Sequence, residues 1–115
     1  MHRECKTNLK AAFVSEKAYF AEFDGYIDDF AKTGFMPERG NAHAYLVSRH
    51  GPTQDRRSPT LAGGPFAIVG VDELKHRVST AAVLAALPST FAGGVDVGVH
   101  GACPACEVVV ACAGD

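Results

Sequence analysis

The sequence lacks both a charge excess and a long apolar run. Eleven Lys and Arg residues stand against thirteen Asp and Glu residues, so the formal net charge is −2 over 115 residues. A surface that neutralises nucleic-acid phosphates carries a basic excess, so nucleic acid is not expected as the main partner, and neither is a polybasic membrane anchor. The longest weakly polar run, residues 61–71, is broken by three glycines and a proline and is too short to span a bilayer.

Signals for export and for catalysis are also missing. The first residues lack the apolar stretch and small-residue cleavage site of a signal peptide, so the chain as written is expected in the cytoplasm. There is no Gly-x-Ser-x-Gly motif and no phosphate-binding Gly-x-x-x-x-Gly-Lys motif. The glycine-rich residues 93–98 lack Lys and predict a turn. We therefore expect no catalytic residue, no cofactor and no enzyme activity.

What is present is the composition of one folded domain, with 47% hydrophobic and 21% charged residues. Residues 7–24 predict an amphipathic helix with Thr7 or Asn8 as its N-cap and Gly25 as its end. The side chains expected to pack this helix on a sheet are Leu9, Phe13, Phe20 and Phe23. Glu16 is placed on its polar face together with several lysines.

The remainder predicts short strands with one further helix. Residues 25–41 are an irregular loop, whose cluster Asp24, Asp28 and Asp29 is expected to be a solvated turn because it lacks the ligand spacing of a calcium loop. Strands are expected at 42–49, 65–71, 95–100 and 107–112, a polar loop at 51–64, and a short helix at 72–87 capped by Asp72. A helix followed by strands without βαβ alternation predicts an α+β fold, with the antiparallel sheet region at 42–115 packed on the helix.

The four cysteines leave several kinds of site open. Cys103 and Cys106 form a Cys-Pro-Ala-Cys turn, but a β-branched run follows where a redox dithiol needs a helix. His100 and Cys112 would complete a zinc site with this pair, although a structural zinc site normally uses two separated ligand pairs. A structural disulfide between Cys103 and Cys106 is favoured, with Cys5 and Cys112 free or paired with each other. An even set of cysteines in a small domain is typical of an exported, oxidised protein.

Several blocks of sequence resemble type IV pilins of the myxobacterial and deltaproteobacterial kind. The most specific block is ECKTNLKAAF at residues 4–13, continued by EKAYFAE at 16–22. GFMPERGN at 34–41 with Tyr45, PSTFAGGV at 88–95 and the Cys103-Pro104-x-Cys106 turn are similar to later parts of such pilins. The resemblance covers most of the chain, and residues 51–64 are its least family-like part.

The resemblance implies a pilin-like roll and a structural subunit of a type IV pilus or pilus-like filament, with roles in motility and adhesion. The partners implied are copies of itself or other pilins and the pilus assembly machinery, outside the cell or at its surface. Pilin heads fold outside the inner membrane, so a Cys103–Cys106 disulfide is expected. A type II secretion pseudopilin shares this plan, and a small zinc or thiol redox module is the alternative from another class.

The sequence departs from the family pattern at both ends. The leader, the cleavage-site glycine, the early glutamate and the hydrophobic stalk that holds a pilin in the membrane are absent from the residues given. Relatives also continue past the position of Asp115. The expectation is therefore an isolated head domain, the C-terminal half of a split pilin, or a fragment from a mis-assigned start.

Overall fold

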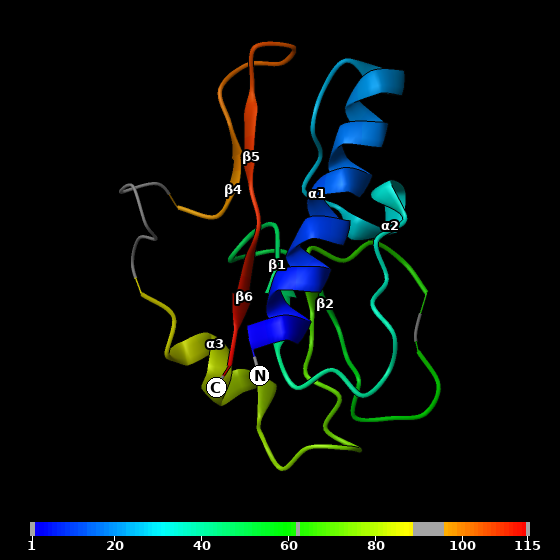
Figure 1. Ribbon diagram of the computed structural model, residues 1–115, viewed down its shortest axis with the longest axis vertical. Helices are drawn as coiled ribbons and strands as arrows, with labels where there is room; N and C mark the ends of the chain where they lie inside the picture. Colours follow the sequence, from blue (N-terminus) through cyan, green and yellow to red (C-terminus); the bar gives the residue numbers. More distant parts are fainter. Residues whose placement is uncertain (1, 62, 89–95, 115) are drawn as a thin grey trace.

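A long helix lies across a four-stranded sheet, and a separate hairpin stands beside the end of the helix (Figure 1). This computed structural model describes residues 2–61, 63–88 and 96–114. The helices are α1 (His2–Phe23), α2 (Phe30–Thr33) and α3 (Thr80–Ala85). The strands are β1 (Ala44–Leu46), β2 (Thr53–Gln54), β3 (Ile68–Val69), β4 (Gly98–His100), β5 (Glu107–Val109) and β6 (Ala111–Ala113). The expected α+β class is confirmed.

The sheet has the strand order β2-β3-β1-β6. Strand β1 is antiparallel to both of its neighbours, and Tyr45 lies opposite Val69 on one side and opposite Cys112 on the other. The pairing of β2 with β3 is parallel, so the expectation of an antiparallel sheet holds for the other pairs only. Strands β4 and β5 form the two-stranded hairpin. Strands β5 and β6 follow each other as one nearly continuous ribbon, interrupted at Val110 (Figure 1).

Strand β1 is buried along its whole length because the sheet is covered on both faces. On one face Tyr45 and Val47 join the cluster beneath α1, which includes Ala12 and the rings of Phe30, Phe35 and Phe66. On the other face Leu46 and Ile68 join a second cluster, against which residues of α3 pack. Alternate side chains of a strand point to opposite faces, so one three-residue strand serves both clusters.

The predicted bounds of the first helix need correction at both ends. Helix α1 begins at His2, so neither Thr7 nor Asn8 is its N-cap. It ends at Phe23, and Asp24, rather than the predicted Gly25, follows it directly, in the left-handed conformation with φ 57°. Asp tolerates this conformation better than most residues do. Gly25 has a different role, because a Cβ built on it would lie 3.1 Å from the Cβ of Cys103. The turn after α1 therefore approaches the tip of the hairpin closely.

Two predicted loops contain regular structure. Within residues 25–41, Asp29 caps α2 by accepting a hydrogen bond from the Ala31 N–H at 3.0 Å, and Gly34 ends this helix at φ 82°. Within residues 51–64, Thr53 and Gln54 form β2. Both elements are too short to produce a hydrophobic period, so the sequence pattern alone does not reveal them.

The predicted helix at 72–87 is also wrong in its first half. Helix α3 begins at Thr80 and is capped by Ser79, whose side chain accepts a hydrogen bond from the Ala82 N–H. Asp72 instead begins a turn and pairs with Arg39. Of the predicted strand at 95–100, Val95 lies outside the described residues, as do most of the block at 88–95 and the first half of the turn at 93–98. The predicted strand at 107–112 is divided into β5 and β6.

Candidate functional site

A row of side chains four residues apart fastens α1 to the sheet. Glu4, Asn8, Ala12 and Glu16 recur at this spacing, which places them on one side of a helix. Ala12 is fully buried and lets α1 approach the sheet closely. Glu4 and Asn8 hydrogen-bond to Tyr45 of β1, and Glu16 accepts a hydrogen bond from the segment that follows α1. The row thus combines close packing with directional contacts.

Glu4 is the most heavily bonded member of the row. Its carboxylate accepts hydrogen bonds from the Ala42 N–H at 2.7 Å, the His43 N–H at 3.1 Å and the Tyr45 hydroxyl at 2.6 Å. It also lies 3.0 Å from Nδ1 of His43. Burial opposes ionisation of Glu4, but the bonds from Tyr45, Ala42 and His43 outweigh it and lower the pKa of the carboxyl. An ionised Glu4 therefore holds the first turns of α1 on β1.

Tyr45 links this contact to the next turn of the helix. Its hydroxyl donates to Glu4 and accepts a hydrogen bond from Nδ2 of Asn8 at 3.0 Å. Burial, followed by the bond to the Glu4 carboxylate, raises the pKa of Tyr45, so this residue is neutral over the physiological range. The ring is fully buried and packs edge-on to Phe35. One side chain thus belongs both to the core and to the polar anchor of α1.

Glu16 is buried as well, but its hydrogen bonding is incomplete. Its Oε1 accepts a hydrogen bond from the Ile27 N–H at 3.1 Å, and Oε2 has no partner among the described residues. Burial raises the pKa of Glu16 to about 7, and the nearby charge of Asp28 acts in the same direction. The placement of Glu16 on the polar face of the helix was wrong. A polar residue four positions after the buried Ala12 was the signal available in the sequence.

Two disulfides reinforce the same region. One joins Cys5 near the start of α1 to Cys112 in β6, with the two Cα atoms 6.0 Å apart. The other joins Cys103 to Cys106 at the tip of the β4–β5 hairpin, where the turn approaches Gly25. The first disulfide attaches the helix to the sheet, and the second closes a loop against the turn after the helix.

This pairing bears on the zinc and thiol alternatives. Cys112 is bonded to Cys5, and Cys103 is bonded to Cys106, so all four sulfurs are engaged in disulfides. The Nε2 atom of His100 lies 2.7 Å from the carbonyl oxygen of Asp96. In the described part of the chain, no three His, Cys, Asp or Glu residues are grouped as metal ligands. The four donors of the zinc alternative are therefore not brought together.

Arginine side chains fix the segment between α2 and β1. Arg56 is almost fully buried and donates to the Pro37 carbonyl at 2.9 Å, to the Glu38 carbonyl at 3.1 Å and to Oδ1 of Asn41 at 2.9 Å. Arg39 forms a two-pronged pair with Asp72, at 2.9 and 3.0 Å. The bond from Arg39 lowers the pKa of Asp72. The sequence analysis missed both arginines, since their partners are distant in sequence.

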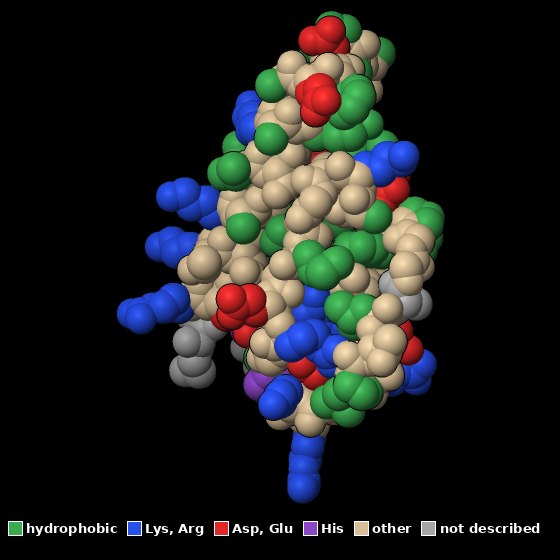
Figure 2. Space-filling model, turned by 90° about the vertical axis from the view of Figure 1, so that its right-hand side faces the viewer, with side chains coloured by type: hydrophobic (Ala, Val, Ile, Leu, Met, Phe, Trp, Pro, Cys, Tyr) green, Lys and Arg blue, Asp and Glu red, His purple; other side chains and the backbone are tan. Residues whose placement is uncertain are grey.

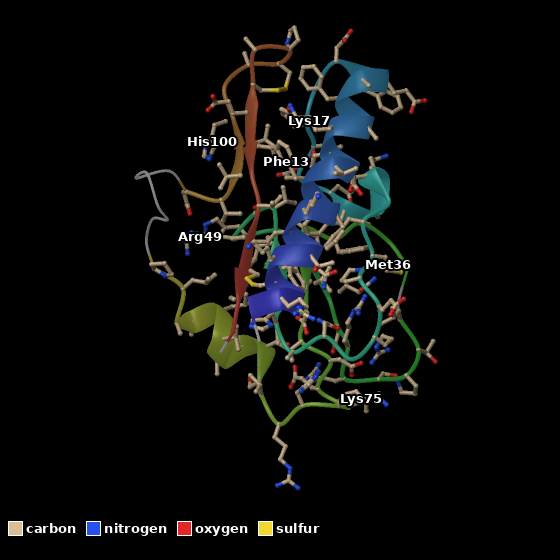
Figure 3. All side chains as sticks on the ribbon, viewed as in Figure 1. Phe13, Lys17, Met36, Arg49, Lys75 and His100 are labelled. Atoms are coloured by element: carbon tan, nitrogen blue, oxygen red, sulfur yellow. A yellow bond between two sulfur atoms is a disulfide. The ribbon has the colours of Figure 1, made fainter. Side chains whose placement is uncertain are left out.

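The four residues predicted to pack α1 on the sheet lie in different surroundings. Leu9 packs against the cluster beneath the helix, and the half-buried Phe20 ring lies 4.7 Å from the ring of Tyr26. Phe13 and Phe23 are 41% and 59% exposed, so the prediction that they face the sheet needs correction. The last turn of α1, which carries Phe23, extends past the four-stranded sheet (Figure 1). Phe13 lies on the flank of the helix, in contact with Lys17 (Figure 3).

The outer side of α1 remains uncovered by this chain. Val14 is 56% exposed beside Phe13, and Met36 is 58% exposed across the helix. A groove of about 740 Å³ runs between α1 and the loop at 34–41, lined by Arg3 and Ala11 from the helix and by Met36 from the loop. The helix is thus fastened on one side and exposed on the other.

Comparison with known proteins identifies the family of this chain. A family model described as "Type IV pilin PilA" matches residues 2–115. This chain belongs to the type IV pilin PilA family. The resemblance seen in the sequence blocks is therefore confirmed.

One curated relative is a pilin of a myxobacterium. The chain is 51% identical over 45 residues to the "Type IV major pilin protein PilA" of Myxococcus xanthus (strain DK1622). The matched segment covers 39% of this chain and 20% of the relative, so the likeness spans only a fifth of that pilin. Among the helices of the described residues, none has the length and apolar character needed to cross a membrane.

Proposed function

We propose that this chain is the globular part of a structural subunit of a type IV pilus, without catalytic activity. The observation that carries the proposal is the pilin family match over residues 2–115. Residues 1–115 would act as a single domain, with other pilin copies and the pilus assembly machinery as partners. Its place would be on the cell surface, where pili serve adhesion and motility.

The anchoring of α1 supports a load-bearing role. A filament under tension transmits force between subunits through the surfaces that they share. In this chain, force applied along α1 reaches the sheet through the Cys5–Cys112 disulfide and through the Glu4 carboxylate. A covalent link near the start of the helix prevents the helix from being pulled away from β6. The exposed side of α1 stays available for neighbouring subunits.

Filaments sheared from cells that carry the gene provide the test. We expect peptides of this chain in the sheared fraction by mass spectrometry, and regular immunogold labelling along the filaments with an antibody against the folded chain. Cells from which the coding sequence is deleted are the matched control and should lose the label. Recovery of the chain only in the cell body, with filaments unlabelled, would refute the proposal.

A further inference from the structure

The exposed charged side chains of α1 include a group of cations along one side of the helix and carboxylates at its C-terminal end. Four exposed cations, Arg3, Lys6, Lys10 and Lys17, recur at spacings of three, four and seven residues and so share one side of α1. We call these four residues the basic stripe. Over 14 residues it extends for about 21 Å along the helix. By the helical period it lies nearly opposite the row that starts at Glu4 and faces the sheet.

The other end of the helix is acidic. Glu22 and Asp24, both exposed, lie in the last turn of α1 and directly after it, and we call these two residues the acidic tip. Figure 2 shows acidic side chains at the upper end of the molecule and Lys and Arg side chains projecting along the edge below. No ion pair joins either group to another residue in the ranges that the structure describes.

Helix stability does not explain the acidic tip. The C-terminal end of a helix carries partial negative charge, so carboxylates there are unfavourable and cations are favourable. The last turn of α1 contains no basic residue, and it carries Glu22. The two carboxylates also repel each other. A cationic surface from outside the chain would relieve both effects.

We propose that the acidic tip of one copy of this chain docks on the basic stripe of a second copy. The contact joins two different surfaces, so it repeats from copy to copy and produces an open-ended assembly. The centre of the stripe, near Lys10, and Glu22 are separated by 12 residues of helix, which sets an axial offset of about 18 Å between the contacting copies. Lys17 lies over the rings of Phe13 and Tyr26, so the apolar flank of α1 continues the same interface. This inference rests on the proposed filament function and names the surfaces that pack.

The test uses zero-length cross-linking of the full chain at low ionic strength. A carbodiimide joins an amine to a carboxylate only when the two are in contact, and mixing ¹⁵N-labelled with unlabelled chain identifies intermolecular links by mass spectrometry. We expect mixed-label links between the lysines of the stripe and the carboxylates of the tip. Because the contact is ionic, their yield should fall as salt is added.

Charge-reversal variants make the test specific. Lys6→Glu with Lys10→Glu should lower the yield of the remaining Lys17 links by about fivefold, because two attractive contacts become repulsive. Mixing this variant with a chain carrying Glu22→Lys should restore part of the intermolecular linking. Asp24 is left unchanged because of its left-handed backbone.

A matched control reverses the same amount of charge elsewhere, with Lys75→Glu and Arg77→Glu on an exposed segment away from α1. Lys75 lies at the opposite end of the molecule from the tip (Figure 3). This control should leave the yield unchanged. Absence of stripe-to-tip links, or an equal loss in the control, would overturn the inference. Links from the stripe to Glu38 or Asp55 instead would refute this contact alone, since the filament role is tested separately in sheared pili.

Discussion

The two disulfides are expected to contribute very different amounts to stability. The perturbation is a pair of double variants, Cys5→Ala with Cys112→Ala in one chain and Cys103→Ala with Cys106→Ala in another. A disulfide stabilises largely by restricting the unfolded chain, and the effect grows with the length of the loop that it closes. The two bridges differ in this length, with sequence separations of 107 and 3 residues.

The expected magnitudes follow from these loop lengths. The loop-entropy relation gives about 5 kcal/mol for the long loop and about 2 kcal/mol for the short one. For a chain of 115 residues, 1 kcal/mol corresponds to about 4 °C in the midpoint of thermal unfolding. The first variant should therefore melt about 20 °C lower than the parent chain and the second about 8 °C lower.

Urea unfolding followed by far-ultraviolet circular dichroism, together with thermal scans, measures both variants against the parent. Breaking the long loop also lets the unfolded state expand, so the dependence of unfolding free energy on urea should steepen in the first variant only. Equal losses in the two variants, or a larger loss for the Cys103 and Cys106 variant, would refute the loop-entropy argument. In that case, local packing at the hairpin tip against Gly25 would be the stronger contribution.

Three further comparisons test the packing of α1 and the sheet. Burial raises the pKa of Glu16 in the folded state to about 7 from a usual 4.5. The contribution of the protonated carboxyl to the stability of the folded chain is therefore fully present below pH 4.5 and is lost as the pH rises through about 7. Glu16→Gln should therefore be more stable than the parent by roughly 2–3 kcal/mol at pH 8 and similar to it at pH 4, as measured by urea unfolding at both values. Gly51→Ala would drive a methyl group into the β-carbon of Ala67 and should cost about 1–3 kcal/mol, whereas Gly63→Ala, with open space around it, is the neutral control. Phe20→Ala should cost about 1–2 kcal/mol and Phe23→Ala under about 0.5 kcal/mol, because only the first ring is covered, and equal costs would contradict the exposures described above.

Local sequence patterns predicted most of the element types. The apolar period of residues 7–24 predicted α1, and the β-branched runs predicted the positions of β1, β3 and β5. These patterns work because each element repeats its own period over several residues. The bounds were less accurate, since helix ends depend on caps such as Asp24 and Ser79 that are chosen among several candidates.

Distant contacts account for the predictions that failed. Asp72 is a residue type that often caps helices, but here it forms an ion pair with Arg39, which lies 33 residues earlier in the sequence. Phe23 has the helical phase of a core residue, yet it is exposed because the sheet ends before the last turn of α1. Both outcomes depend on the position of a second element, which a local pattern does not contain.

The sequence by itself determined the α+β class, the amphipathic helix and the pilin resemblance, because these depend on period and on short blocks of residue types. Only the tertiary structure decided which polar groups are buried and how the four cysteines pair. Glu4 and Arg56 are residue types usually found on surfaces, and their burial becomes favourable only when backbone N–H groups, carbonyls and Tyr45 are brought to them from elsewhere in the chain. Glu16 is buried with one of its two oxygens unpaired, which only the packing around α1 reveals. Such surroundings bring together groups that are apart in sequence, so they exist only once the chain has folded.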